Sequence, residues 1–85
     1  MAAEVLRLLV RRQCHLCELV RGPLANLTAR AGVPLLELDV DEHPRLRQSY
    51  SERIPVVLWR DRVVAEGRFD PQSVLDAIGL GRGSR

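Results

Sequence analysis

The chain has 85 residues, 46% of them hydrophobic and 28% charged, with a formal net charge of +2 at pH 7. This length fits one domain and excludes a large buried catalytic chamber. All 13 basic residues are arginines scattered along the chain, so neither a nucleic-acid surface nor lysine chemistry is expected. No apolar run approaches the roughly 18 residues of a membrane helix, and charges interrupt the first segment too early for a signal peptide. We therefore expect a cytoplasmic monomer with no membrane or nucleic-acid partner.

The first half of the chain predicts a strand, a helix and a second strand. Residues 4–10, EVLRLLV, are short and apolar, as in a buried strand. The apolar residues of 16–31 follow helical spacing, and Gly32 is expected to end this helix. Pro23, which follows a glycine inside the helix, predicts a kink or a restart because proline removes a backbone hydrogen bond. Residues 35–40, LLELDV, alternate apolar and acidic side chains, which predicts a strand with one wetter face.

Capping signals predict two further helices in the second half. Asp41 is expected to cap a short helix within residues 41–53, with Pro44 in its first turn. Asp70 is expected to cap a last helix whose first position is Pro71, where the missing N–H of proline has no intrahelical partner to lose.

A β-hairpin is predicted between these two helices. Residues 55–59 and 62–66 are rich in valine and flank a two-residue turn, RD. The element order is then β-α-β-α-β-β-α in a single domain over residues 1–80, followed by a flexible tail at 81–85. A parallel strand pair from the β-α-β unit and the hairpin together make a four-stranded mixed sheet with helices on both faces. The predicted fold class is α/β.

Both cysteines of the chain lie in one motif, Cys14-His15-Leu16-Cys17, between the first strand and the first helix. A cysteine at a helix start meets free backbone N–H groups and the positive end of the helix dipole, and both favour the thiolate. The pKa of a thiol in such a setting falls from about 8.5 to roughly 3.5–7.5. Cys14 is therefore the candidate nucleophile, and Cys17 lies one turn inward, placed to resolve a mixed disulfide. His15 and the nearby Arg11 and Arg12 add positive or dipolar character that favours the thiolate further.

Other chemistries stay open for this motif. Two inert buried cysteines would fit a binding module that keeps the fold as a scaffold for another protein. A disulfide that changes the affinity for a partner would make the protein a redox sensor. A structural zinc site needs four ligands, and His15 cannot readily share one ion with both Cys14 and Cys17. We therefore predict no metal site within the chain, and keep an iron–sulfur cluster or metal carrier as a lesser alternative.

Three stretches carry a resemblance to a known family. CHLC follows the first strand, RIPVV precedes the hairpin, and EGRFDPQSVLDAIG leads into the last helix. With the element order, they resemble glutaredoxin-like members of the thioredoxin superfamily over about residues 4–79. The resemblance implies a thioredoxin-like fold, with Cys14 as the attacking and Cys17 as the resolving thiol. It also implies a cis Ile54–Pro55 bond that brings this loop near the cysteines, with substrate backbone pairing beside Ile54.

The resemblance further implies how glutathione would be held. Gly67 and Asp70 belong to the segment that holds the γ-glutamyl end of glutathione in glutaredoxins. Arg11 occupies the place of a lysine that often meets the glycine carboxylate. The chain departs from the pattern at Arg53, where a threonine is frequent, at Glu66, where a glycine is frequent, and between the cysteines, where Pro-Tyr is usual.

These inferences predict a thiol–disulfide oxidoreductase that reduces protein or glutathione mixed disulfides. The expected partners are a protein disulfide substrate and an external reductant, which is glutathione or a reductase. No cofactor is expected to be permanently bound, and glutathione would act as a co-substrate.

Overall fold

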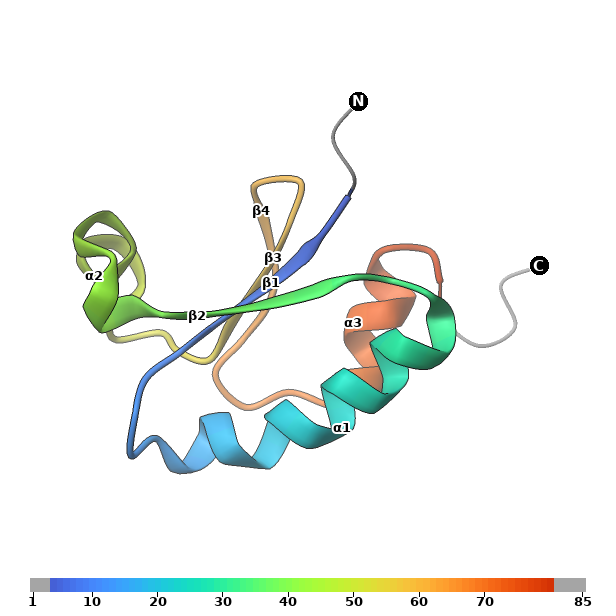
Figure 1. The fold of residues 1–85 in the computed structure, drawn as a ribbon, viewed down its shortest axis with the longest axis horizontal. Coiled ribbons are helices and arrows are strands. Elements are labelled where there is room, and N and C mark those ends of the chain that lie inside the picture. The colour runs from blue at the N-terminus through green and yellow to red at the C-terminus, as the bar shows by residue number, and fades with distance from the viewer. Residues whose placement is uncertain (1–3, 81–85) are drawn as a thin grey trace.

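The computed structural model describes residues 4–80, which form four strands and three α-helices in the predicted order. The elements are β1 (Leu6–Val10), α1 (His15–Ala31), β2 (Leu35–Asp39), the 3-10 turn η1 (Val40–Glu42), α2 (Pro44–Tyr50), β3 (Val56–Trp59), β4 (Arg62–Glu66) and α3 (Pro71–Ala77). The predicted tail at 81–85 lies outside the described residues. In Figure 1, α1 and α3 lie on one side of the sheet and α2 lies on the other. The predicted α/β class, with a mixed sheet covered on both faces, is confirmed.

β1 is an interior strand of the sheet. The strand order is β2-β1-β3-β4, with β1 parallel to β2 and antiparallel to β3, and β3 antiparallel to β4. Leu8 of β1 pairs with Glu37 on one side and with Val57 on the other. Because β1 is flanked on both sides and covered by helices, its carboxyl end delivers the residues after Val10 to the middle of one sheet edge.

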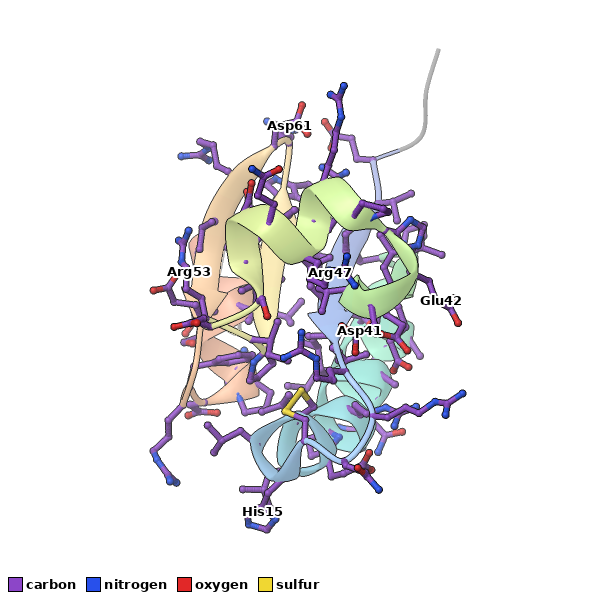
Figure 2. All side chains as sticks on the ribbon, turned by 90° about the vertical axis from the view of Figure 1, so that its left-hand side faces the viewer. His15, Asp41, Glu42, Arg47, Arg53 and Asp61 are labelled. Atoms are coloured by element: carbon purple, nitrogen blue, oxygen red, sulfur yellow. A yellow bond between two sulfur atoms is a disulfide. The ribbon has the colours of Figure 1, made fainter. Side chains whose placement is uncertain are left out.

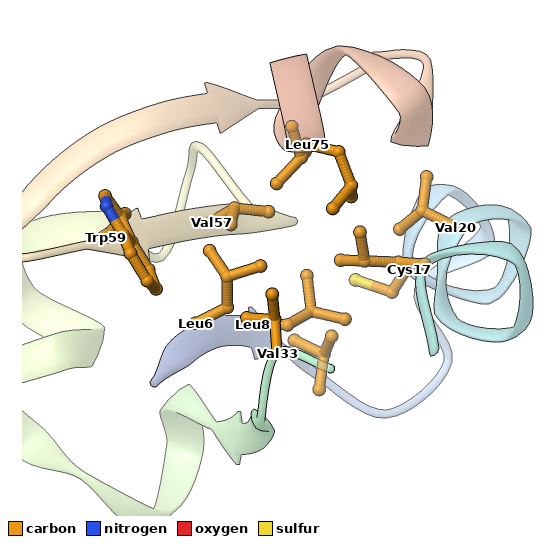
Figure 3. Packing of buried hydrophobic residues seen from close by; sticks show 11 residues of the cluster. Leu6, Leu8, Cys17, Val20, Val33, Val57, Trp59 and Leu75 are labelled. Atoms are coloured by element: carbon orange, nitrogen blue, oxygen red, sulfur yellow. The ribbon is translucent and has the colours of Figure 1, made fainter. Parts of the chain in front are cut away.

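The hydrophobic core consists of two clusters, one on each face of the sheet. Side chains alternate along a strand, so Leu8 faces α1 and α3 whereas its neighbour Leu9 faces α2. Figure 3 shows the larger cluster, in which the Cys17 sulfur lies among aliphatic side chains. Each fully buried leucine or valine contributes about 1.5–3 kcal/mol relative to an exposed one. The larger cluster comprises Leu6, Leu8, Val10, Cys17, Val20, Leu24, Val33, Val57, Trp59, Val74 and Leu75.

Helix α1 runs without a break through Pro23, so the predicted restart is wrong. The missing N–H of Pro23 leaves the Leu19 carbonyl without its helical partner. Pro23 is exposed and Leu19 is 51% exposed, so water can reach this carbonyl. On the opposite side of α1, Val20 and Leu24 are buried against the sheet, and their packing holds the helix together. Gly32 ends α1 with a φ of 73°, as predicted.

The second helix differs from its prediction. Asp41 is not its N-cap, since α2 begins at Pro44 with His43 as an N-cap that makes no side-chain hydrogen bond. Asp41 lies instead in η1, and its backbone N–H donates to the Asp39 carboxylate at 2.9 Å. The Asp39 side chain thus caps the 3-10 turn from two residues before Asp41, which leaves the Asp41 carboxylate available for another partner.

The predicted hairpin and the predicted cap of the last helix are both present. Arg60 and Asp61 have φ values of 55° and 65°, the left-handed conformations of a tight hairpin turn between β3 and β4. The backbone N–H of Gln72 donates to the Asp70 carboxylate at 3.0 Å, and Pro71 occupies the first position of α3. The turn and the helix cap form as predicted because each depends only on residues that are close together in the sequence.

Candidate active site

A short loop joins the end of β1 to the start of α1. Gln13 has a φ of 56°, a left-handed conformation that is uncommon for a residue other than glycine and that turns the chain toward the helix. Cys14 is extended, with φ −112° and ψ 107°, and is the N-cap of α1. The loop therefore places the Cys14 side chain at the free N–H groups of the first helical turn.

The two cysteines form a disulfide, and their Cα atoms lie 5.2 Å apart. The backbone N–H of Cys17 donates to Cys14 Sγ, with 3.2 Å between nitrogen and sulfur. Cys14 is half-buried, whereas Cys17 is fully buried in the larger core cluster. In the reduced protein the same amide and the helix dipole would stabilise negative charge on Cys14 and would do so much less for Cys17.

His15 is the first residue of α1 and is exposed. Figure 2 shows its ring pointing outward, away from the disulfide. His15 thus follows Cys14 directly in the chain, and its ring is turned away from the sulfur atoms. Any effect of His15 on the cysteines would act through its charge at the helix start.

The loop before β3 packs against the same core cluster as the two cysteines. The Ile54–Pro55 peptide bond is cis, and both Ile54 and Cys14 pack against the larger core cluster. The backbone N–H of Gly67 donates to two carbonyls of this loop, Arg53 O at 3.2 Å and Pro55 O at 2.8 Å. The structure therefore packs Cys14 and Ile54 against one core cluster and fixes the loop before β3 to Gly67, the residue after β4.

Two of the expected glutathione residues have internal hydrogen bonds. Gly67 has a φ of 68°, and its amide is engaged by the loop before β3. Asp70 is exposed, and its carboxylate caps α3. Both residues lie in the segment between β4 and α3. The hydrogen bonds described here for Gly67 and Asp70 are made to other residues of the chain.

Arg11 is held by two internal partners. Its Nε donates to Asp41 Oδ2 at 2.9 Å, and its Nη2 donates to Asp41 Oδ1 at 3.0 Å and to Ser51 Oγ at 2.7 Å. The hydrogen bond with Asp41 raises the pKa of Arg11. The same bond, with the charges of Arg11, Arg47 and Arg12, lowers the pKa of Asp41. The guanidinium group expected to meet a substrate carboxylate is therefore paired with a carboxylate of the chain itself.

Arg53 and Glu66, two of the residues that depart from the glutaredoxin pattern, form an ion pair with each other. Arg53 donates to Glu66 Oε1 from Nη2 at 2.6 Å and from Nε at 2.9 Å. Its guanidinium lies over the Tyr50 ring, 5.1 Å from the ring centroid. This ion pair links the end of α2 to the end of β4 across the loop that carries the cis peptide bond.

Sequence reasoning did not identify Asp41 and Ser51 as residues of this site. They lie 30 and 40 residues from Arg11, beyond the reach of any local motif. One signal could have found Asp41, because Arg11 directly follows β1 and Asp41 closely follows β2. The carboxyl ends of neighbouring parallel strands meet at the same edge of a sheet, which brings such residues together.

The described residues hold neither a metal-binding cluster nor a helix that could span a membrane. Residues 4–80 contain no group of three or more histidine, cysteine or acidic side chains arranged to hold a metal ion. Among the helices described for this chain, none has the length and apolar character needed to cross a membrane.

Two solved structures share this fold. The protein Ne2328 from Nitrosomonas europaea has a TM-score of 0.70 and 26% sequence identity, and the match covers 93% of this chain and 91% of Ne2328. A structure described as a malarial protein has a TM-score of 0.66 over 91% of this chain and 94% of its own, and its 17% identity shows the fold alone.

Sequence comparison finds relatives of this chain and a matching family. The uncharacterized protein Rv0508 of Mycobacterium tuberculosis is 35% identical over 67 residues, which cover 73% of this chain and 69% of Rv0508. The uncharacterized protein Mb0520 of Mycobacterium bovis matches with the same identity and coverage. The family described as glutaredoxin-like domain (DUF836) matches residues 5–79, which include Cys14, Cys17 and the Ile54–Pro55 loop. The chain belongs to this glutaredoxin-like family.

Proposed function

We propose that this protein is a thiol–disulfide oxidoreductase, with Cys14 as the nucleophile and Cys17 as the resolving thiol. The observation that carries the proposal is the position of the pair at the start of α1. Cys14 Sγ accepts the Cys17 N–H, and Cys14 is a half-buried residue, whereas Cys17 is fully buried. An accessible sulfur whose negative charge is stabilised is the one that can attack an incoming disulfide.

The reaction takes place in two exchanges. The Cys14 thiolate attacks one sulfur of the substrate disulfide, so that a Cys14–substrate disulfide forms and the other substrate sulfur leaves as a thiolate. Cys17 then loses its proton and attacks Cys14 Sγ, which releases the second substrate thiolate. The substrate gains two electrons, and the protein is left with the Cys14–Cys17 disulfide that the structure contains.

The loop at Ile54 and Pro55 is the proposed docking edge for the substrate. An extended substrate would pair its backbone beside Ile54, in the manner of an added strand. The two Gly67 hydrogen bonds that fix this loop support the assignment, because a rigid edge loses little entropy on binding. We assign Gly67 and Asp70 to the support of this edge, and His15 to a secondary role in which its charge favours the Cys14 thiolate.

A second partner must return the protein to its dithiol form. The proposed reductant is glutathione, acting as a co-substrate, or a reductase, and no cofactor stays bound to the chain. A cytoplasmic location fits this cycle because the thiol pool there keeps such pairs reduced. We propose that the protein acts as a monomer.

The proposal is tested by trapping the mixed disulfide. The Cys17→Ser variant should form a stable covalent adduct with an oxidised protein substrate, because the resolving thiol is missing. The adduct should disappear on treatment with dithiothreitol, and its mass should equal the sum of the variant and one substrate chain. The Cys14→Ser variant is the matched control and should form no adduct. Normal multiple turnover of protein disulfides by Cys17→Ser would remove Cys17 from the mechanism.

A further inference from the structure

The Arg11 guanidinium lies where two loops of the candidate site meet. Arg11 precedes Cys14 by three residues in one loop, and its partner Ser51 precedes Ile54 by three residues in the other. Cys14 and Ile54 both pack against the larger core cluster. The hydrogen bond from Arg11 to Ser51 joins these two loops, so a disulfide that reached Cys14 between them would approach the ion pair of Arg11 and Asp41.

A carboxylate of the chain itself already binds this guanidinium. Asp41 binds it through two hydrogen bonds of 2.9 and 3.0 Å, a bidentate geometry that fixes both groups. Arg12 and Arg47 also act on Asp41 through their charges, and Asp39 acts on Arg11. Figure 2 shows Asp41 between the disulfide and Arg47, which lies near the middle of the molecule in this view. Removing the Asp41 charge would leave this corner with a local excess of positive charge.

We propose that Asp41 is a specificity-determining residue of the dithiol, because it takes the place of a substrate carboxylate on Arg11. A disulfide that carries a carboxylate near its sulfur must displace Asp41 or approach its negative charge, whereas a neutral disulfide meets no such barrier. The protein would thus favour neutral segments of polypeptide over small acidic disulfides. This inference rests on the proposed function, since it concerns which disulfides Cys14 attacks.

The test compares two small aromatic disulfides in single turnover. Dithiobis(nitrobenzoate) carries one carboxylate on each ring, and dithiodipyridine is neutral at pH 7. The protein is reduced, freed of reductant and mixed with each probe, and release of the aromatic thiol is followed by absorbance. In each case Cys14 attacks the probe and Cys17 completes the exchange, so two aromatic thiolates appear per protein. The readout is the rate constant for the acidic probe divided by that for the neutral probe. A change in Cys14 reactivity alters both rate constants alike and leaves this ratio unchanged.

The Asp41→Asn variant should raise this ratio, acidic over neutral, by about three- to tenfold at low salt, the effect of one nearby charge. The increase should shrink at high salt, because screening weakens interactions between exposed charges. Asp41→Ala should give the same increase, since the charge rather than the side-chain shape is responsible.

Asp61→Asn is the matched control. Asp61 is also in an ion pair with an arginine, Arg7, at 2.6 Å, and Figure 2 shows it at the far end of the molecule from the disulfide. Its removal should leave the ratio unchanged.

The outcomes separate this inference from the proposed function. An unchanged ratio in both Asp41 variants overturns the specificity role, and so does a fall of both rates in equal proportion, which would show that Asp41 only positions the loop. If the wild-type protein reacts with the neutral probe no faster than free cysteine does, the proposed function fails, whatever the ratio. A raised ratio with fast reaction of the neutral probe supports both.

Discussion

Cys14 and Cys17 are identical in chemistry and differ in their surroundings. Cys14 is half-buried and accepts an amide hydrogen bond, whereas Cys17 is fully buried among aliphatic side chains. A thiolate is stabilised by the first setting and destabilised by the second. Burial and one hydrogen bond, rather than neighbouring acid–base groups, therefore support the two proposed roles. The His15 ring points outward, away from the disulfide.

The ion pair between Arg11 and Asp41 makes stability depend on pH. Asp41 has a lowered pKa in the folded protein because Arg11 hydrogen-bonds its ionised form. The unfolded chain therefore takes up this proton at a higher pH than the folded chain does. The stabilisation by Asp41 is fully present above about pH 4, the range of an unfolded aspartate, and is lost as the pH falls through the lower folded pKa.

We therefore predict that Asp41→Asn loses stability relative to wild type at neutral pH and that this difference closes under acidic conditions. Urea unfolding of both proteins at several pH values between 2 and 7 measures it. A difference that widens below pH 4 would contradict the sign of the linkage.

At the scale of elements, the notable feature is a proline inside the first helix. α1 tolerates Pro23 because the carbonyl that loses its partner lies on an exposed flank, while Val20 and Leu24 hold the inner face. An isolated helix would break there, since proline costs about 3 kcal/mol in a helix interior. Tertiary packing therefore overrides the local preference.

We predict that Pro23→Ala stabilises the protein by about 1–2 kcal/mol. The restored hydrogen bond favours the folded state, and the added freedom of the unfolded chain offsets part of the gain. Thermal and urea unfolding measure the change, with the neighbouring exposed Ala25→Ser as a control for general surface effects. A loss of stability would mean that the proline shapes α1 for its packing on the sheet.

At the scale of the whole molecule, the sequence predicted the parts that depend on neighbours in the chain. The element order, the Gly32 end of α1, the hairpin turn and the Asp70 cap follow from local periodicity and capping. The position of the cysteines between strand and helix also follows from it. What escaped prediction depends on distant residues, above all the contacts that Arg11 makes with Asp41 and Ser51.

The errors have the same origin. The predicted restart at Pro23 ignored the packing of α1 on the sheet. The predicted cap at Asp41 ignored Asp39, which lies two residues earlier and caps the 3-10 turn η1. A local pattern specifies which element forms, whereas side-chain partners across the sheet edge depend on the assembled topology. The site is therefore located by the sequence and completed by the fold.

The most direct test of the central claim is the redox equilibrium of the Cys14–Cys17 pair. The protein is equilibrated in glutathione buffers of increasing oxidation, quenched with an alkylating agent and read by mass spectrometry. We predict a reversible intrachain disulfide with a midpoint between roughly −180 and −280 mV, the range of working dithiol oxidoreductases. Two thiols that stay reduced over this whole range, or a disulfide that does not return to the dithiol, would contradict a role in thiol–disulfide exchange.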